Sequence, residues 1–161
     1  MMRHDTALRD HLVRLLRGGQ AHVTFEEVIA GWPARLRGRR PVGAPYTAWQ
    51  LLEHMRIAQW DILDFCRNPA YVQPSWPDAY WPATASPPSD AAWRKSIRTF
   101  RRDKRAVQRL VLNPKTDLFA RIPWGRGRTY LREALLVADH NAYHLGQLIL
   151  LRRLLGVWEQ G

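Results

Sequence analysis

Residues 134–151, ALLVADHNAYHLGQLILL, form a strongly apolar segment that nevertheless carries five polar residues in its middle. The stretch from Thr129 to about Leu155 has the length of a long helix, and Gly156 is a typical C-terminal stop. Apolar residues fall on nearly every side of this expected helix, which predicts that it is buried at the centre of the protein. Each polar side chain buried there without a partner would cost about 1 to 3 kcal/mol, so these residues need partners or a ligand.

The rest of the chain has the same helical character. A Thr-x-x-Glu capping box begins at Thr24, Thr47 is a plausible N-cap, and Ser89 or Asp90 caps a later helix. No internal repeat and no alternating strand pattern is present. The expected helices cover residues 6–17, 24–30, 47–67, 89–112 and 129–155. Long helices joined by loops predict an all-α fold of the helix-bundle type.

Residues 68–88 hold six prolines and four large aromatic residues. The prolines exclude a helix, whereas the aromatic side chains favour burial, so we expect an ordered loop packed over one end of the domain. Trp76, Tyr80 and Trp81 of this loop are candidates for the wall of a cavity, although simple packing explains them equally well.

The 161 residues are 46% hydrophobic, which suffices for one core, and we expect a single domain over residues 1–161. No run of about 18 apolar residues indicates a transmembrane helix. The N-terminal segment carries charges where a signal peptide would be apolar, so a cytoplasmic location is expected. The lone Cys66 cannot form an internal disulfide, and its apolar neighbours predict a small buried side chain without a catalytic role.

The net charge of +11 raises nucleic acid as a partner. Of the 25 basic residues 22 are arginines, and they are dispersed along the chain, which argues against a dedicated binding motif. The densest cluster, residues 94–109, has the spacing of a solvent-facing stripe on one helix and lacks the interleaved aromatics that single strands stack on. A nucleic-acid partner therefore stays open but is not favoured.

Three histidines form the strongest candidate site. His140 and His144 are four residues apart, so both imidazoles lie on one helix face, a spacing by which helices offer two nitrogens to one metal ion. His54 lies among apolar residues of the 47–67 helix, and it would complete a three-nitrogen site with open positions for water. The alternative is that the three histidines satisfy one another through hydrogen bonds with no ion present.

At these residues the chain resembles a known family. LLEH at 51–54 and DHNAYHLGQL at 139–148 resemble the DinB-like superfamily, which is named for a damage-inducible protein and includes bacillithiol S-transferases and mycothiol-dependent maleylpyruvate isomerases. The resemblance implies a four-helix bundle, often a homodimer, with a divalent ion, nickel or zinc, on His54, His140 and His144. In this chain a short extra N-terminal helix and the loop rich in proline and tryptophan would be added to it. Gln147 matches a glutamine of the family motif.

Helix spacing adds candidates around the histidines. Gln50 lies four residues before His54 and Asp61 seven after it, so both lie near the same stripe. Gln50 and Gln147 are expected to orient imidazoles or to face the cavity and a cofactor. Asp61 is the first candidate for a catalytic general base, with a purely structural role as its alternative.

The chemistry of such a site defines the expected function. An ion held by three neutral imidazoles keeps its full charge and lowers the pKa of a bound water or thiol. No GxSxG, P-loop or GxGxxG motif supplies a different chemistry. The sequence therefore predicts a metal-dependent enzyme acting on a small molecule, either a hydrolase or an S-transferase that uses a low-molecular-weight thiol. The alternative is a non-catalytic metal-binding or DNA-associated stress-response protein.

Overall fold

The computed structural model describes residues 3–158, and within them it is helical, with a single isolated bridge between Arg121 and Thr129 as its only β pairing. The α-helices are α1 (Arg3–Arg17), α2 (Phe25–Ile29), α3 (Ala48–Arg67), α4 (Asp90–Leu112) and α5 (Tyr130–Leu154), and the one-turn 3₁₀ helices are η1 (Ala34–Leu36) and η2 (Asp78–Tyr80). The prediction of an all-α fold is confirmed. Across residues 3–158, no helix combines the length and the apolar character needed to cross a membrane.

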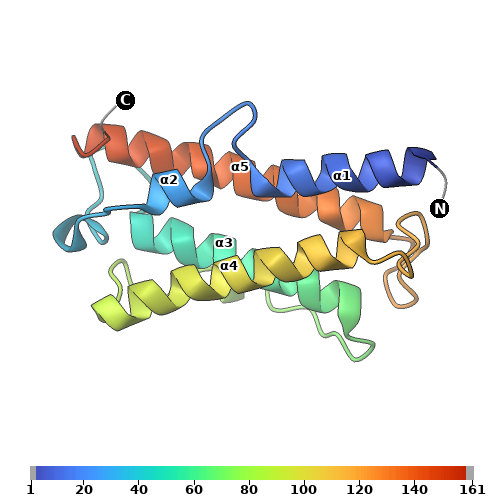
Figure 1. Cartoon of the computed structure of the whole chain (residues 1–161). Coiled ribbons are helices and arrows are strands. Elements are labelled where there is room, and N and C mark those ends of the chain that lie inside the picture. The colour runs from blue at the N-terminus through green and yellow to red at the C-terminus, as the bar shows by residue number, and fades with distance from the viewer. Residues whose placement is uncertain (1–2, 159–161) are drawn as a thin grey trace.

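The long helices α1, α3, α4 and α5 lie lengthwise beside one another, and α2 covers one end (Figure 1). Helix α3 packs against both α4 and α5, and α1 closes the other side against α4 and α5. Helices α3 and α5 run in opposite directions, so the N-terminal half of α3 lies beside the C-terminal half of α5 (Figure 1). This antiparallel pair holds the candidate site.

Four of the five α-helices begin directly after the N-caps that the sequence predicts, whereas α1 begins at Arg3, three residues before the expected start. Thr24, Thr47, Ser89 and Thr129 each accept a hydrogen bond from a backbone N–H in the first turn of the helix that follows. These bonds satisfy donors that the first helical turn would otherwise leave unpaired. The predicted boundaries therefore differ from the observed ones by only a few residues.

The apolar side chains gather in two main clusters. One lies at the α2 end and is built around Leu52, Phe100 and Leu148, and the other lies at the α1 end around Leu12 and Val111. Of these, Leu52, Leu148 and Val111 are fully buried. The two clusters hold the long helices together from end to end and fix the register between α3 and α5.

Helix α5 corrects one expectation from the sequence. It is not buried all round: Leu135, Tyr143, Leu150 and Leu154 are between 44% and 64% exposed. The reason is that α5 lies at the edge of the assembly, where its inner face meets α1, α3 and α4 and its outer face meets no other helix of residues 3–158 (Figure 1). The apolar residues on all sides of α5 therefore form an exposed apolar face as well as a buried one.

The loop between α3 and α4 is ordered, as predicted, and includes η2. Tyr80 is buried and Trp81 half-buried, but Trp76 is 67% exposed and only touches the edge of the Tyr80 ring. The expectation that all the aromatic residues of this loop are buried is therefore wrong for Trp76, which lies outside Tyr80 on the solvent side. Cys66 is buried and free, as predicted.

Candidate metal site

His54 of α3 meets His140 and His144 of α5 between the two antiparallel helices. One nitrogen of each ring lies within 4.8 Å of the others, and this is a geometry that can hold a metal ion. His54 and His144 are only 3% and 6% exposed, and His140 is half-buried. The fold thus brings together the three residues that the sequence singles out.

Two of the three rings are oriented by hydrogen bonds from their far nitrogen. The Nδ1–H of His54 donates to the backbone carbonyl of Tyr80 at 2.9 Å, and the Nδ1–H of His144 donates to the side-chain oxygen of Gln147 at 2.7 Å. Since both acceptors are carbonyl oxygens, these Nδ1 atoms carry the ring protons. The Nε2 atoms of His54 and His144 are therefore left as lone pairs, which is the form that binds metals.

The spacing of the nitrogens fits a metal ion. The Nε2 atoms of His54 and His140 are 3.1 Å apart. With metal–nitrogen bonds of about 2.1 Å, two ligands are about 3.4 Å apart at a tetrahedral ion and about 3.0 Å apart at an octahedral one. The same distance also suits a direct N–H···N hydrogen bond from His140 to His54, so geometry accommodates both of the arrangements that the sequence leaves open.

Burial keeps the three imidazoles neutral. Burial lowers the pKa of His140 to about 3, and the neighbouring His144 and His54 add to this effect. Burial also lowers the pKa of His54 and of His144, against the opposing hydrogen bonds to Tyr80 and Gln147. At neutral pH the cluster therefore presents uncharged nitrogen donors, and protons do not compete strongly for them.

Asp61 does not contact the histidine rings and instead holds the loop that does. Its two carboxylate oxygens accept hydrogen bonds from the hydroxyls of Tyr71 at 2.8 Å and Tyr80 at 2.7 Å. Tyr80 is also the residue whose backbone carbonyl accepts the hydrogen bond from the Nδ1–H of His54. Asp61 is thus connected to the site through Tyr80, which is the arrangement of a positioning residue.

The two predicted glutamines have different surroundings. Gln147 contacts the site directly, through its bond to His144. Gln50 does not: its side-chain oxygen accepts from the backbone N–H of Thr47 at 3.0 Å and completes the capping box of α3. A capping role for Gln50 follows from its position three residues after the N-cap, which the sequence already shows.

An aromatic stack covers the site on its loop side. The Trp81 ring lies parallel to His54, with centroids 3.9 Å apart and planes inclined by 3°. Tyr46 stacks on Trp81 in turn, with centroids 4.1 Å apart. These contacts restrict the rotation of the His54 ring. The composition of the loop suggests a cavity wall, but no pattern in the sequence indicates that Trp81 lies against His54 in particular.

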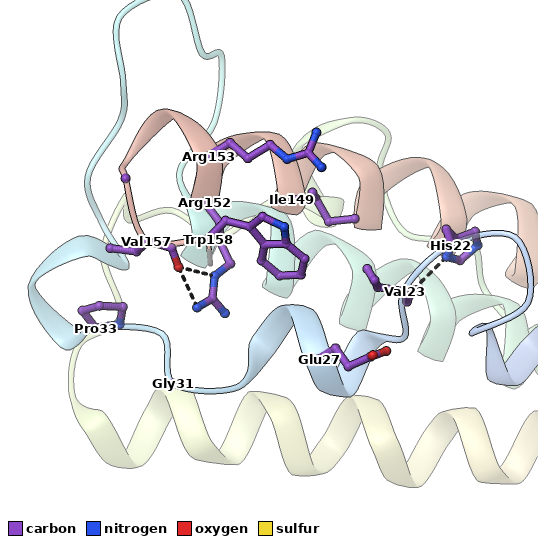
Figure 2. A pocket seen from close by; sticks show the side chains of 11 residues that line it. His22, Val23, Glu27, Gly31, Pro33, Ile149, Arg152, Arg153, Val157 and Trp158 are labelled. Atoms are coloured by element: carbon purple, nitrogen blue, oxygen red, sulfur yellow. Dashed lines mark hydrogen bonds between the residues drawn. The ribbon is translucent and has the colours of Figure 1, made fainter. Parts of the chain in front are cut away.

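A cavity of about 1060 Å³ lies away from the histidines, between α2 and the end of α5 (Figure 2). None of the three clustered histidines lines it. Two of its charged groups already have structural partners: the Arg152 guanidinium donates to the backbone carbonyls of Val28, Ala30 and Val157, and Glu27 belongs to the capping box of α2. Size alone therefore does not make this cavity the functional site.

Comparison with protein-family models, curated proteins and solved structures found no match. The function therefore has to be inferred from the three histidines and from the residues that orient them.

Proposed function

We propose that this chain is a metal-dependent enzyme that acts on a small molecule, with a divalent ion, nickel or zinc, on His54, His140 and His144. The observation that carries the proposal is the convergence of three buried or half-buried imidazoles, two of them with their Nδ1 protons fixed by carbonyl acceptors. The proposal includes a DinB-like four-helix bundle, which is in keeping with the order of the helices and the HxxYHxGQ pattern of α5.

The residues around the proposed ion support an open, catalytic type of site. Three histidine ligands leave coordination positions for water or substrate, whereas structural sites use four protein ligands. When bound, the ion would supply Lewis acidity that lowers the pKa of a water or of a thiol at neutral pH. Hydrolysis and transfer of a low-molecular-weight thiol are the two reaction classes that this chemistry serves.

The protein offers few competing groups for the chemical step. Cys66 is buried, and burial together with the nearby Glu133 raises the pKa of its thiol to about 12, so it carries almost no thiolate at neutral pH. Both oxygens of Asp61 are engaged by tyrosine hydroxyls. We therefore assign Asp61 to positioning and expect the nucleophile to come from water or from a thiol cofactor.

Metal content tests the proposal first. We expect near-stoichiometric nickel or zinc by elemental analysis of untagged protein purified without chelator, and loss of that metal in His54→Ala, His140→Ala and His144→Ala. The matched control is His22→Ala, because His22 is exposed and outside the cluster. If the parent protein binds no metal even after incubation with zinc and nickel, the enzyme proposal is wrong and the histidines are paired directly.

The alternative of a DNA-associated protein has one observation in its favour. Arg98, Arg105 and Arg109 are exposed on one side of α4, as expected for the solvent-facing stripe, whereas Arg101 of the same stripe is half-buried and pairs with Glu26 of α2. Phosphate binding by such a stripe would weaken steeply between low and moderate salt. We regard this alternative as weaker because the arginines lie on a helix that presents no recognition motif.

A further inference from the structure

A small apolar cavity lies between the segment 43–46, the start of α3 and the C-terminal part of α5. Its volume is about 150 Å³, and its lining includes Tyr46, Leu51 of α3, and Gln147, Leu150 and Leu151 of α5. Apart from the Gln147 amide and the Tyr46 hydroxyl, the lining side chains are apolar, and none is charged. Sites that enclose a whole small molecule are apolar with few polar groups and measure about 300 to 1,000 Å³, so this cavity has the size and the lining to hold only one apolar end of such a molecule.

The helix register places this cavity about one turn from the histidines. Leu51 precedes His54 by three residues, and Gln147 follows His144 by three, so each lies on the same face as its histidine. Because α3 and α5 are antiparallel, both displacements run in the same direction along the helix pair (Figure 1). Two residues of the cavity wall, Leu51 and Gln147, therefore lie about one helical turn from His54 and His144.

Two contacts join the cavity wall to the metal ligands. Gln147 lines the cavity and also accepts the Nδ1 proton of His144. Tyr46 lines it and belongs to the stack of Tyr46, Trp81 and His54. A ligand in the cavity would therefore touch residues that orient two of the three histidines.

We propose that this cavity binds the apolar tail of a substrate whose oxygen- or sulfur-bearing head reaches the three histidines. The absence of a charged group among the lining residues sets the class of tail, because a charge placed there would be desolvated without an ionic partner. The substrate class is thus a small molecule with a slim, uncharged hydrocarbon end. This inference rests on the proposed metal-dependent function.

Straight-chain hydroxamic acids of increasing length test the inference, with affinity for the zinc-loaded protein measured by calorimetry. The hydroxamate head binds zinc, and the chain reports on the cavity. We expect affinity to rise about four-fold for each methylene added until the cavity is full, so hexanohydroxamate, with four more methylenes, should bind up to about 250-fold more tightly than acetohydroxamate.

A cavity-filling variant locates the tail. Leu150→Trp narrows the cavity from its rim and should abolish the gain with chain length while acetohydroxamate still binds. Leu112→Trp is the matched control, since Leu112 is exposed on α4 and is not among the lining residues. Circular dichroism of both variants establishes that they fold alike.

The outcomes separate the two proposals. If acetohydroxamate binds but longer chains gain nothing, or if the gain survives in Leu150→Trp, the tail lies elsewhere and the cavity assignment is overturned while the metal-dependent function stands. If no member of the series binds the zinc-treated protein, the metal-dependent function fails and the cavity assignment fails with it.

Discussion

At the scale of single residues, some groups of the site can be predicted from the sequence and others cannot. The histidine ligands are predictable because helical spacing brings His140 and His144 to one face and because His54 is a polar residue in an apolar stripe. The hydrogen bond from the Nδ1–H of His54 is accepted by the backbone carbonyl of Tyr80, and every residue possesses a backbone carbonyl. Such a partner leaves no signature in the sequence, and this is why the link from Asp61 through Tyr80 to His54 was not predictable.

The link from Asp61 to His54 predicts an effect on metal affinity. Asp61→Ala leaves the hydroxyls of Tyr71 and Tyr80 without their acceptor, so the loop should loosen and His54 should lose its orientation. We expect zinc affinity to fall by roughly 10- to 100-fold, as for other residues that hold metal ligands in place. Competition with a zinc-chelating dye measures this change.

Tyr80→Phe removes only one of the two hydrogen bonds that Asp61→Ala would remove. Tyr143→Phe is the control for Tyr80→Phe. Tyr80→Phe keeps the backbone carbonyl but removes one hydrogen bond to a buried carboxylate, which should cost about 1.5 to 3 kcal/mol of stability. Tyr143 is 64% exposed, so its hydroxyl should be dispensable. Unchanged zinc affinity in Asp61→Ala would show that the loop does not orient His54.

At the scale of helices, the beginnings of elements are more predictable than the ends. A Ser or Thr N-cap acts on its own first turn, so Thr24, Thr47, Ser89 and Thr129 are recognisable from a few neighbouring residues. The C-terminal end of α4 is different. Its carbonyls are satisfied by Arg9, a buried residue of α1 that is more than 100 positions away in the chain. An arginine with such a distant partner is indistinguishable in sequence from the exposed ones.

Arg9 therefore predicts a large stability effect at a position that looks like ordinary surface. Its guanidinium donates to the carbonyls of Val111, Asn113 and Thr116 and pairs with Asp5. Arg9→Met keeps much of the apolar stem but removes the donor for the buried Val111 carbonyl and for the more exposed carbonyls of Asn113 and Thr116. We expect it to lower the free energy of unfolding by about 2 to 4 kcal/mol. Urea denaturation measures the change.

Arg105→Met is the control for Arg9→Met, because Arg105 is exposed on α4. An exposed substitution of this kind should stay within about 0.5 kcal/mol of the parent. Equal stability of the two variants would mean that Arg9 does not hold the end of α4.

At the scale of the whole molecule, the histidine cluster makes stability depend on pH. Histidines of an unfolded chain take up protons near pH 6.5, whereas His140 in the folded, metal-free protein takes one up only near pH 3. Between these values the unfolded state binds more protons, so the free energy of unfolding rises with pH and is lost as the pH falls. The lowered pKa values of His54 and His144 act in the same direction.

We expect the urea concentration at the unfolding midpoint of the metal-free protein to decrease as the pH is lowered from 7 to 5. This range lies above the usual titration of carboxylates. His140→Gln should show a shallower dependence over that range, since it removes the most strongly shifted group. A midpoint that is equally steep in His140→Gln would assign the pH dependence to other residues.

The stack of Trp81 on His54 gives the protein an intrinsic fluorescent reporter of metal binding. An indole in face-to-face contact with a metal ligand changes its emission when that ligand binds an ion, and paramagnetic nickel would quench it more strongly than closed-shell zinc. Trp81 is one of eight tryptophans, and its contact with His54 at a centroid distance of 3.9 Å sets it apart as a reporter of the site. Occupancy could then be followed in unlabelled protein, with Trp81→Phe giving the baseline from the other seven.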